Sequence, residues 1–433
     1  MPTKKIYTNT IAQIVSKVLT ALISIVMIKI LTNYLDVAWY GLYSKIYNYL
    51  SIFAVMADLG LYTITVRELS AHEWDKKMQE KIAANVLSLR TFSGLLIIGL
   101  ALSVGYFLDG YNSREALIGV FIVWVFTLLW LINSSLMSYL QAILKTEFSI
   151  IANTTGKIVT LAIISYAWWT TYGESHIDRF ILVMVAGLIG NLIMTLLTWW
   201  YASRWQRVRF EWDTTYIQHI LKISIPYGVA LFLGVIFFKV DVILLSILEP
   251  HDIADTAIAL YSLPMKIIEV GMMYGTVFLN SLLPVLTIAY ERQDTARVKK
   301  LIKHAFILLF GGWIIASLVL FFWAEDILML ISSREFIETT AYGYGSIDAM
   351  RVVAWVFFVY TVSALFTYIL IAQNKQRKML TINAVVAVFN IIGNIIIIPY
   401  YSFIGSAYVT LASQILLFLL VVYATRENFV KTR

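Results

Sequence analysis

Residues 52–69 read IFAVMADLGLYTITVREL, and the carboxylate of Asp58 lies in a run that is otherwise almost entirely apolar. A helix of about 20 apolar residues is long enough to cross a bilayer. An unpaired charge inside such a helix is costly, so intramembrane carboxylates usually face a partner or a polar cavity. The stretch therefore predicts a membrane-spanning helix in which Asp58 faces other protein groups.

The composition of the whole chain agrees with this interpretation. The chain has 433 residues, of which 60% are hydrophobic and 14% are charged, and its mean hydropathy is +0.79. Soluble domains are about half apolar and about a quarter charged, so this chain is predicted to be a polytopic membrane protein. It contains no cysteine, which excludes disulfides and thiolate chemistry. We find no P-loop, dinucleotide-binding or HExxH pattern, so no cofactor is expected.

Apolar windows of spanning length predict twelve transmembrane helices. The first six lie near 9–31, 40–62, 85–108, 116–143, 149–169 and 179–201. The second six lie near 220–248, 256–289, 304–323, 346–372, 380–399 and 402–424. The first window is longer than a signal-peptide core and lacks an A-x-A site, so we interpret it as an uncleaved helix. Pro226 and Pro264 are candidate kink points in the two longest spans.

The distribution of basic residues predicts the orientation. Only three of the 33 Lys and Arg residues, Arg114, Arg179 and Arg334, fall in the predicted outer loops. The positive-inside rule therefore places both termini in the cytoplasm and the protein in the cytoplasmic membrane. This bias explains the net charge of +7 without a nucleic-acid partner. The outer loops are too short for a large external domain.

Weak similarities between the two halves suggest an internal repeat. GLYS at 41–44 matches ALYS at 259–262, and AILKTEFSIIAN at 142–153 aligns with AQNKQRKMLTIN at 372–383. Chance similarity between apolar helices is the alternative. Each half holds six spans, an even number, so the halves are expected to be parallel lobes with a cleft between them. We predict an N-terminal lobe at 1–203, a cytoplasmic linker at 204–219 and a C-terminal lobe at 220–433.

Charged residues within the predicted spans are mostly basic. Four are clearly acidic, Asp58, Asp241, Glu269 and Asp348. Eight are basic: Lys17, Lys29, Lys45, Arg90, Lys157, Lys239, Lys266 and Arg351. Intramembrane charges often mark a substrate path, and this excess of positive charge favours an anionic ligand. Hydrogen bonding between helices is the alternative for the polar stripes that accompany them.

Helical spacing sorts these residues into candidate roles. We expect Lys29, Arg90 and Arg351 to reach the headgroups, because they lie near the ends of their predicted spans. Lys266 and Glu269 are i, i+3 neighbours, whereas Lys239 and Asp241 must have separate partners. The candidate substrate-binding cations are Lys17, Lys45, Lys157, Lys239 and Lys266, and the candidate ion-pair or coupling acids are Asp58, Asp241 and Glu269.

A pair between Lys17 and Asp58 is the leading hypothesis for the stretch at 52–69. Asp58 lies nine residues before Arg67, and Lys17 lies ten residues after Tyr7. With a helical rise of 1.5 Å, both are roughly 13–15 Å from the cytoplasmic side. An Asp58 that binds a coupling H⁺ or Na⁺ is the rival interpretation, and a purely structural pair is the third.

Several segments resemble the Wzx-type polysaccharide repeat-unit flippases of the multidrug/oligosaccharidyl-lipid/polysaccharide exporter superfamily. They are ILTNYLDVAWYGLYSKIYNYLSIFAVMADLGL at 30–61, VREL at 66–69, ISIPYG at 223–228 and LLPVLT at 282–287. The resemblance implies two six-helix lobes in a V that work by alternating access. It also implies a substrate, an oligosaccharide on a polyprenyl pyrophosphate that serves O-antigen, capsule or exopolysaccharide synthesis. Polysaccharide assembly proteins are the implied protein partners.

Three other functions are alternatives to this one. Multidrug exporters of the superfamily are expected to carry an acidic pocket, whereas this interior is basic. Lipid II flippases usually have fourteen spans rather than twelve. A polyprenyl-dependent glycosyltransferase would need paired acids in an outer loop, and the loop around Asp36 offers no such pair. We therefore do not expect an enzyme.

Overall fold

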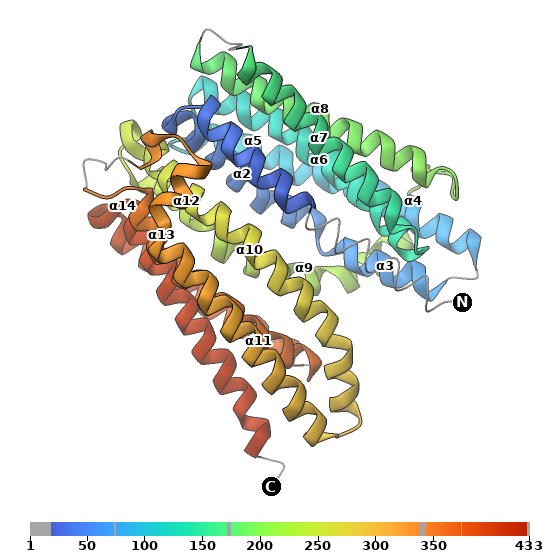
Figure 1. Cartoon of the computed structure of the whole chain (residues 1–433). Coiled ribbons are helices and arrows are strands. Elements are labelled where there is room, and N and C mark those ends of the chain that lie inside the picture. Colours follow the sequence, from blue (N-terminus) through green and yellow to red (C-terminus); the bar gives the residue numbers. More distant parts are fainter. Residues whose placement is uncertain (1–18, 73–74, 171–174, 338–342, 374, 431–433) are drawn as a thin grey trace. The chain divides into compact units, whose positions relative to one another are not determined.

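The computed structural model describes residues 19–72, 75–170, 175–337, 343–373 and 375–430. Within these ranges the chain is helical and contains no strand (Figure 1). It divides into two compact units, Met1–Val235 and Ile236–Arg433. Helix α9 (Thr214–Leu248) belongs to both units, because the division falls inside it.

The helices of the N-terminal unit occur in the following chain order. A helix at Leu19–Tyr34 comes first and is followed by α2 (Val37–Asp58) and α3 (Leu61–Ala71). The third predicted span is formed by α4 (Lys76–Ser93), the π-helix η1 (Gly94–Ile98) and α5 (Gly99–Phe107). Three long helices complete the unit before α9: α6 (Arg114–Ala142), α7 (Thr146–Trp169) and α8 (His176–Ala202).

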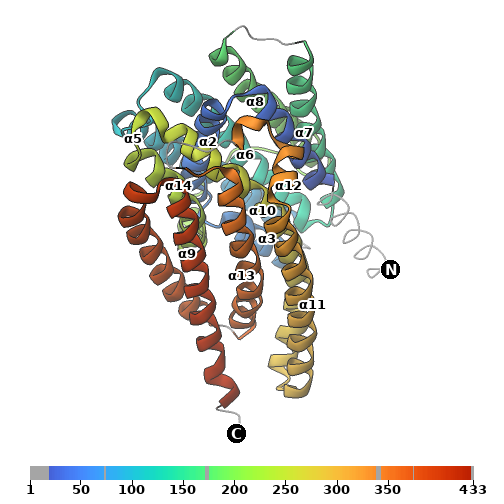
Figure 2. The same ribbon diagram turned by 60° about the vertical axis from the view of Figure 1, so that its left-hand side comes forward.

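The C-terminal unit continues from α9 into α10 (His251–Glu291) and α11 (Thr295–Phe322). Two short helices follow, α12 (Ala324–Ile331) and the 3₁₀ helix η2 (Arg334–Phe336). The unit ends with α13 (Ser346–Ala372) and α14 (Gln376–Val430). Helix α13 packs against α10, α11 and α14, which run alongside it (Figures 1 and 2).

The prediction of an all-helical membrane protein with about twelve spans is confirmed. Ten described helices are long and apolar enough to cross a membrane. One of them contains both of the last two predicted spans, since α14 changes direction at Ser402 (φ 51°), shortly after Pro399. The shorter Leu19–Tyr34 helix is the described part of the first predicted span. Helices α9 and α10 each continue through the proline proposed as a kink point, Pro226 and Pro264.

One helix break was not predicted. The second predicted span ran without interruption to residue 62, but α2 ends at Asp58 and α3 begins at Leu61. Leu59 (φ 51°) and Gly60 (φ 69°) both have left-handed backbone conformations. Glycine adopts this conformation freely, whereas a leucine in it costs about 1 kcal/mol or more, so tertiary contacts must hold the break in place.

The core of the N-terminal unit joins α3, α4 and α6 to the start of α9. Leu61, Ile82, Leu140 and Ile220 are buried together in it. The linker before α9 is fixed to α4 by its backbone, because the N–H of Glu211 donates to Ser88 Oγ (2.9 Å). Such contacts explain why the first part of α9 lies with the N-terminal unit.

Asp213 anchors the beginning of α9. Its Oδ1 accepts from the Tyr216 N–H (3.1 Å) and caps the helix, and its own N–H donates to Asn85 Oδ1 (2.6 Å). Lys81 Nζ lies 2.5 Å from Asp213 Oδ2. The hydrogen bond from Lys81 lowers the pKa of the Asp213 carboxyl, which therefore stays ionised at neutral pH.

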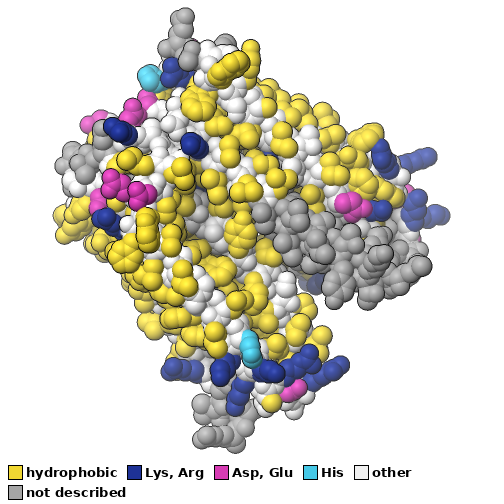
Figure 3. Space-filling model, in the orientation of Figure 1, with side chains coloured by type: hydrophobic (Ala, Val, Ile, Leu, Met, Phe, Trp, Pro, Cys, Tyr) yellow, Lys and Arg dark blue, Asp and Glu magenta, His cyan; other side chains and the backbone are white. Residues whose placement is uncertain are grey.

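Hydrophobic side chains cover most of the visible surface of each unit, as a lipid-facing protein requires (Figure 3). In the C-terminal unit, basic side chains gather at the end that carries the α10–α11 turn (Figure 3). The exposed residues there include Arg292, Arg297, Lys299, Lys300 and Lys303. A basic end next to an apolar band is the pattern that the positive-inside rule associates with the cytoplasm.

Single-cysteine labelling tests the orientation, since the chain has no cysteine of its own. We expect a membrane-impermeant maleimide to label Arg334→Cys in intact cells, because η2 lies in a predicted outer loop. Lys300→Cys should be labelled only after the membrane is permeabilised. The reverse pattern would show that the orientation is wrong.

Candidate substrate and coupling sites

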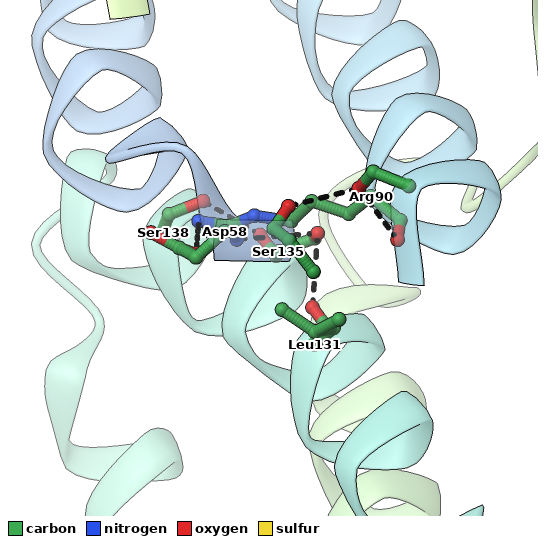
Figure 4. A network of polar contacts seen from close by, with 7 residues as sticks. Asp58, Arg90, Leu131, Ser135 and Ser138 are labelled. Atoms are coloured by element: carbon green, nitrogen blue, oxygen red, sulfur yellow. Dashed lines mark hydrogen bonds and ion pairs between the residues drawn. The ribbon is translucent and has the colours of Figure 1, made fainter. Parts of the chain in front are cut away.

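A buried ion pair joins α2 to α4 in the N-terminal unit. Arg90 Nη2 donates to Asp58 Oδ1 at 2.6 Å, and Arg90 Nη1 donates to Ser135 Oγ of α6 at 3.3 Å (Figure 4). The Arg90 side chain is 0% exposed and that of Asp58 is 13% exposed. Ser93 Oγ donates to the carbonyl of Ala57 at 2.9 Å, which satisfies an oxygen freed by the end of α2. Helix α4 thus holds the last turn of α2 at two points.

The prediction that Arg90 reaches the headgroups is wrong. The prediction assumed that the span begins at residue 85, whereas α4 begins at Lys76. With a rise of 1.5 Å per residue, Arg90 therefore lies about 21 Å from the start of the helix. From that depth a guanidinium pairs with a carboxylate because it cannot reach water. Lys29 and Arg351, by contrast, are exposed, as expected of residues near span ends.

The pairing of Asp58 with Lys17 stays a prediction, because Lys17 lies outside the described residues. The described partner of Asp58 is Arg90. Two other candidate cations lie in the N-terminal unit. Lys45 is 4% exposed in α2, with Nζ 5.5 Å from the centre of the Tyr111 ring, and Lys157 is half-buried in α7. Their assignment to a substrate path also stays a prediction.

The other two candidate cations meet a single carboxylate in the C-terminal unit. Lys239 Nζ of α9 lies 2.7 Å from Glu269 Oε1, and Lys266 Nζ lies 3.0 Å from Glu269 Oε2. The i, i+3 pairing of Lys266 with Glu269 is as predicted, and Lys239 adds a cation from the neighbouring helix. The three side chains are 18% (Lys239), 29% (Glu269) and 42% (Lys266) exposed. We call these three residues the cation cluster; it carries one net positive charge.

Asp241 lies two residues beyond Lys239 and points to a different environment, as its position predicted. It is 0% exposed. Its Oδ1 accepts from Asn394 Nδ2 (2.8 Å), and its Oδ2 accepts from Tyr261 OH and Thr410 Oγ1 (2.6 Å each). We call Asp241, Tyr261, Asn394 and Thr410 the carboxylate centre. Tyr261, Asn394 and Thr410 are neutral donors, so hydrogen bonds rather than an ion pair with them stabilise the charge.

Two polar atoms, in the carboxylate centre or one helical turn from it, are buried without a partner among the described residues. They are Asn394 Oδ1 and Ser406 Oγ. Buried polar atoms are normally paired, so these oxygens are available to a small polar guest such as water or an ion. If Asp241 were protonated, its carboxyl group could itself donate a hydrogen bond to one of these neighbours.

The sequence identified part of this centre. Asn390 and Asn394 lie four residues apart, and so on one face, in the eleventh predicted span, and Tyr261 belongs to the ALYS segment at 259–262. Thr410 was missed. Hydroxyl residues are common on buried helix faces, where they bond to their own helix, so nothing in the sequence distinguished Thr410.

Comparison with family sequence profiles shows which protein family the chain belongs to. A profile described as polysaccharide biosynthesis protein matches residues 6–290, and one described as MatE matches residues 226–396. A comparison with curated proteins gave no match. The described helices are those of a multi-pass membrane protein. The chain belongs to the polysaccharide biosynthesis protein family.

Solved structures show the same fold. An inward-facing multidrug resistance MATE family transporter of the MOP superfamily has a TM-score of 0.71 at 14% identity, over 96% of both chains. The lipid II flippase MurJ, in an inward closed conformation, has a TM-score of 0.67 at 17% identity, over 97% of this chain and 87% of that one. A MOP superfamily transporter from Pyrococcus furiosus is described as having a binding pocket of reverse polarity. It has a TM-score of 0.66 at 13% identity, over 98% of this chain and 96% of that one.

Removing one partner of the Asp58–Arg90 pair should destabilise the N-terminal unit. Breaking a buried pair typically costs about 3–5 kcal/mol, because the remaining charge is left without compensation. We expect Asp58→Asn to lower the thermal unfolding midpoint in detergent, while Asp109→Asn at an exposed outer position does not. In the double variant with Arg90→Met, the loss should be smaller than the sum of the single losses. Additive losses would contradict a direct interaction.

Proposed function

We propose that the protein is a flippase that moves a polyprenyl-pyrophosphate-linked oligosaccharide from the inner to the outer leaflet of the cytoplasmic membrane by alternating access. Such a substrate is a repeat unit for O-antigen, capsule or exopolysaccharide. The cation cluster is the observation that carries the proposal. The polysaccharide biosynthesis family supports the substrate class, and the likeness to the lipid II flippase MurJ supports a lipid-linked cargo on this fold.

The charge of the cation cluster suits a pyrophosphate. One carboxylate, Glu269, contacts two ammonium groups, so it can neutralise only one of them. Lys266 is the most exposed of the three, and it is the cation that an incoming phosphate oxygen reaches first. Hydrogen bonds between ammonium and phosphate are about twice as strong as neutral ones, and more so away from water. A cationic drug would be repelled by the same residual charge.

The carboxylate centre supplies coupling in this proposal. Asp241 binds H⁺ or Na⁺ and releases it during the cycle, so that an ion gradient drives transport. Its carboxylate, amide and hydroxyl oxygens are the hard ligands that a small cation prefers, and the carboxylate is equally a proton acceptor. Asp241 lies on α9 two residues from Lys239, so ion and substrate act on one helix.

The basic end of the C-terminal unit supports a proposed cellular setting. The protein is proposed to sit in the cytoplasmic membrane with both termini in the cytoplasm. Polysaccharide assembly proteins on the outer side would take over the flipped lipid.

Reconstituted transport tests the substrate assignment. We expect wild-type proteoliposomes to move a labelled polyprenyl-pyrophosphate oligosaccharide between leaflets. Lys266→Gln should slow transport about tenfold or more at low substrate, because one charge-assisted contact is worth roughly 1.5–3 kcal/mol. Lys266→Arg should keep most of the activity. Lys300→Gln, on the exposed surface of α11, is the control and should transport normally.

Other outcomes distinguish the alternatives. Export of a cationic drug with no movement of any polyprenyl lipid would assign the chain to multidrug transport. Movement of lipid II in preference to lipid-linked oligosaccharides would assign it to peptidoglycan synthesis. Equal transport by Lys266→Gln and wild type would remove the cation cluster from the substrate site and leave the flippase in place.

Coupling is tested at Asp241. We expect Asp241→Asn to abolish the acceleration of transport by an imposed H⁺ or Na⁺ gradient, because the amide neither gains a proton nor carries a charge. Tyr261→Phe, which removes one donor and keeps the carboxylate, should retain gradient dependence with altered ion affinity. A gradient response that survives in Asp241→Asn would place coupling elsewhere.

A further inference from the structure

The break between α2 and α3 lies directly against the backbone of α9. A Cβ atom on Gly228 would be 2.6 Å from the carbonyl carbon of Leu59 and 2.7 Å from its oxygen. A Cβ atom on Gly60 would be 2.6 Å from Cδ1 of Tyr227 and 3.1 Å from the nitrogen of Gly228. The two backbones are therefore so close that a glycine is needed on each side, Gly60 at the break and Gly228 on α9. No side chain other than hydrogen fits at Gly228 without moving the Leu59 backbone.

Both sides of this contact have unusual backbones. On one side, Leu59 and Gly60 are left-handed. The Asp58–Arg90 pair (Figure 4) holds the residue just before them, and the Ser93 hydroxyl holds the carbonyl of Ala57. On the other side, Pro226 lacks an N–H and so removes one backbone hydrogen bond from α9. The Leu59–Gly60 break, which is held by these contacts, thus packs against α9 next to Pro226, where α9 bends most easily.

The contact lies on the same helix as the candidate ligand-binding residues of the C-terminal unit, so a movement of that helix can reach it. Gly228 lies with the N-terminal unit, whereas Lys239 and Asp241 lie on the same helix in the C-terminal unit. Eleven residues separate Gly228 from Lys239, about 16 Å at 1.5 Å per residue. A helix shared by two units must bend or release a contact whenever the units move relative to each other. Close backbone contacts between small residues hold helices by packing alone, without hydrogen bonds to break.

We propose that Leu59, Gly60, Tyr227 and Gly228 form a clasp that is closed in this conformation and opens during each transport cycle. The inference rests on the proposed alternating-access function and adds the element that changes. Ligand binding at Lys239 or Asp241 shifts α9, and the clasp releases at Gly228. The Asp58–Arg90 pair acts as a positioning interaction, because it fixes the break against which Gly228 packs.

A reversible disulfide tests whether the clasp opens. The Gly60→Cys/Tyr227→Cys variant places the only two cysteines of the chain at the contact, and removal of the Tyr227 ring relieves the closest contact of the new Cβ atom. We expect the oxidised variant to flip the labelled lipid at least about tenfold more slowly than the same variant reduced with dithiothreitol, which is the reference because Gly60→Cys alters the contact by itself. Unchanged flipping by fully cross-linked protein would overturn the proposal, because the contact would then never open.

Matched glycine substitutions on α9 provide the second test. Gly228→Ala should favour the open clasp and slow flipping about tenfold, since its methyl group meets the Leu59 backbone. Gly234→Ala, on the same helix, is the control, because a Cβ atom there has no neighbour within 4 Å. Equal loss of activity in both variants would assign the effect to helix flexibility and overturn the clasp.

A labelling readout separates failure of the clasp from failure of the flippase assignment. Ser224 is fully buried and lies one helical turn before Gly228 on the same face. We expect a maleimide to modify Ser224→Cys about fivefold faster in the Gly228→Ala background and at an unchanged rate with Gly234→Ala. Equal rates in a correctly folded Gly228→Ala protein would overturn the clasp whether or not any lipid is moved. If Gly228→Ala does not fold, the disulfide pair decides.

Discussion

The ion pair between Asp58 and Arg90 is the interaction on which the N-terminal unit depends. Arg90 has no exposed surface, so its charge is compensated by Asp58 or not at all. The pair sits at the last residue of α2. The next two residues, Leu59 and Gly60, have left-handed conformations and present their backbone to Gly228 of α9.

Helix α9 carries both the residue that packs against this break and two charged residues of the C-terminal unit. Along one helix the chain places a close backbone contact at Gly228, a cation at Lys239 and a buried carboxylate at Asp241. Lys239 and Asp241 differ by about 200° around the helix, so they enter different environments. One environment holds a second lysine and a partly exposed carboxylate. The other holds only neutral donors around a carboxylate that is fully buried.

These two environments favour different ligands. The cation cluster has one positive charge beyond what Glu269 neutralises and is partly exposed, which suits a large anionic headgroup. The carboxylate centre has one negative charge, and Asn394 Oδ1 is a buried acceptor with no partner among the described residues, which suits a proton or a small cation. In the proposed flippase, opposite charge requirements on one helix would give a simple physical basis for coupling ion movement to the movement of an anionic lipid.

The sequence by itself determined the class of fold. Apolar length located the spans, since a bilayer imposes one length on every crossing helix, and i, i+3 spacing identified the contact between Lys266 and Glu269. Only the tertiary structure decided the partner of Asp58 and the role of Arg90, because depth depends on where α4 begins. It also decided the Leu59–Gly60 break and the meeting of Thr410 with Asp241. Those contacts join residues up to 169 positions apart, and local periodicity carries no record of such distances.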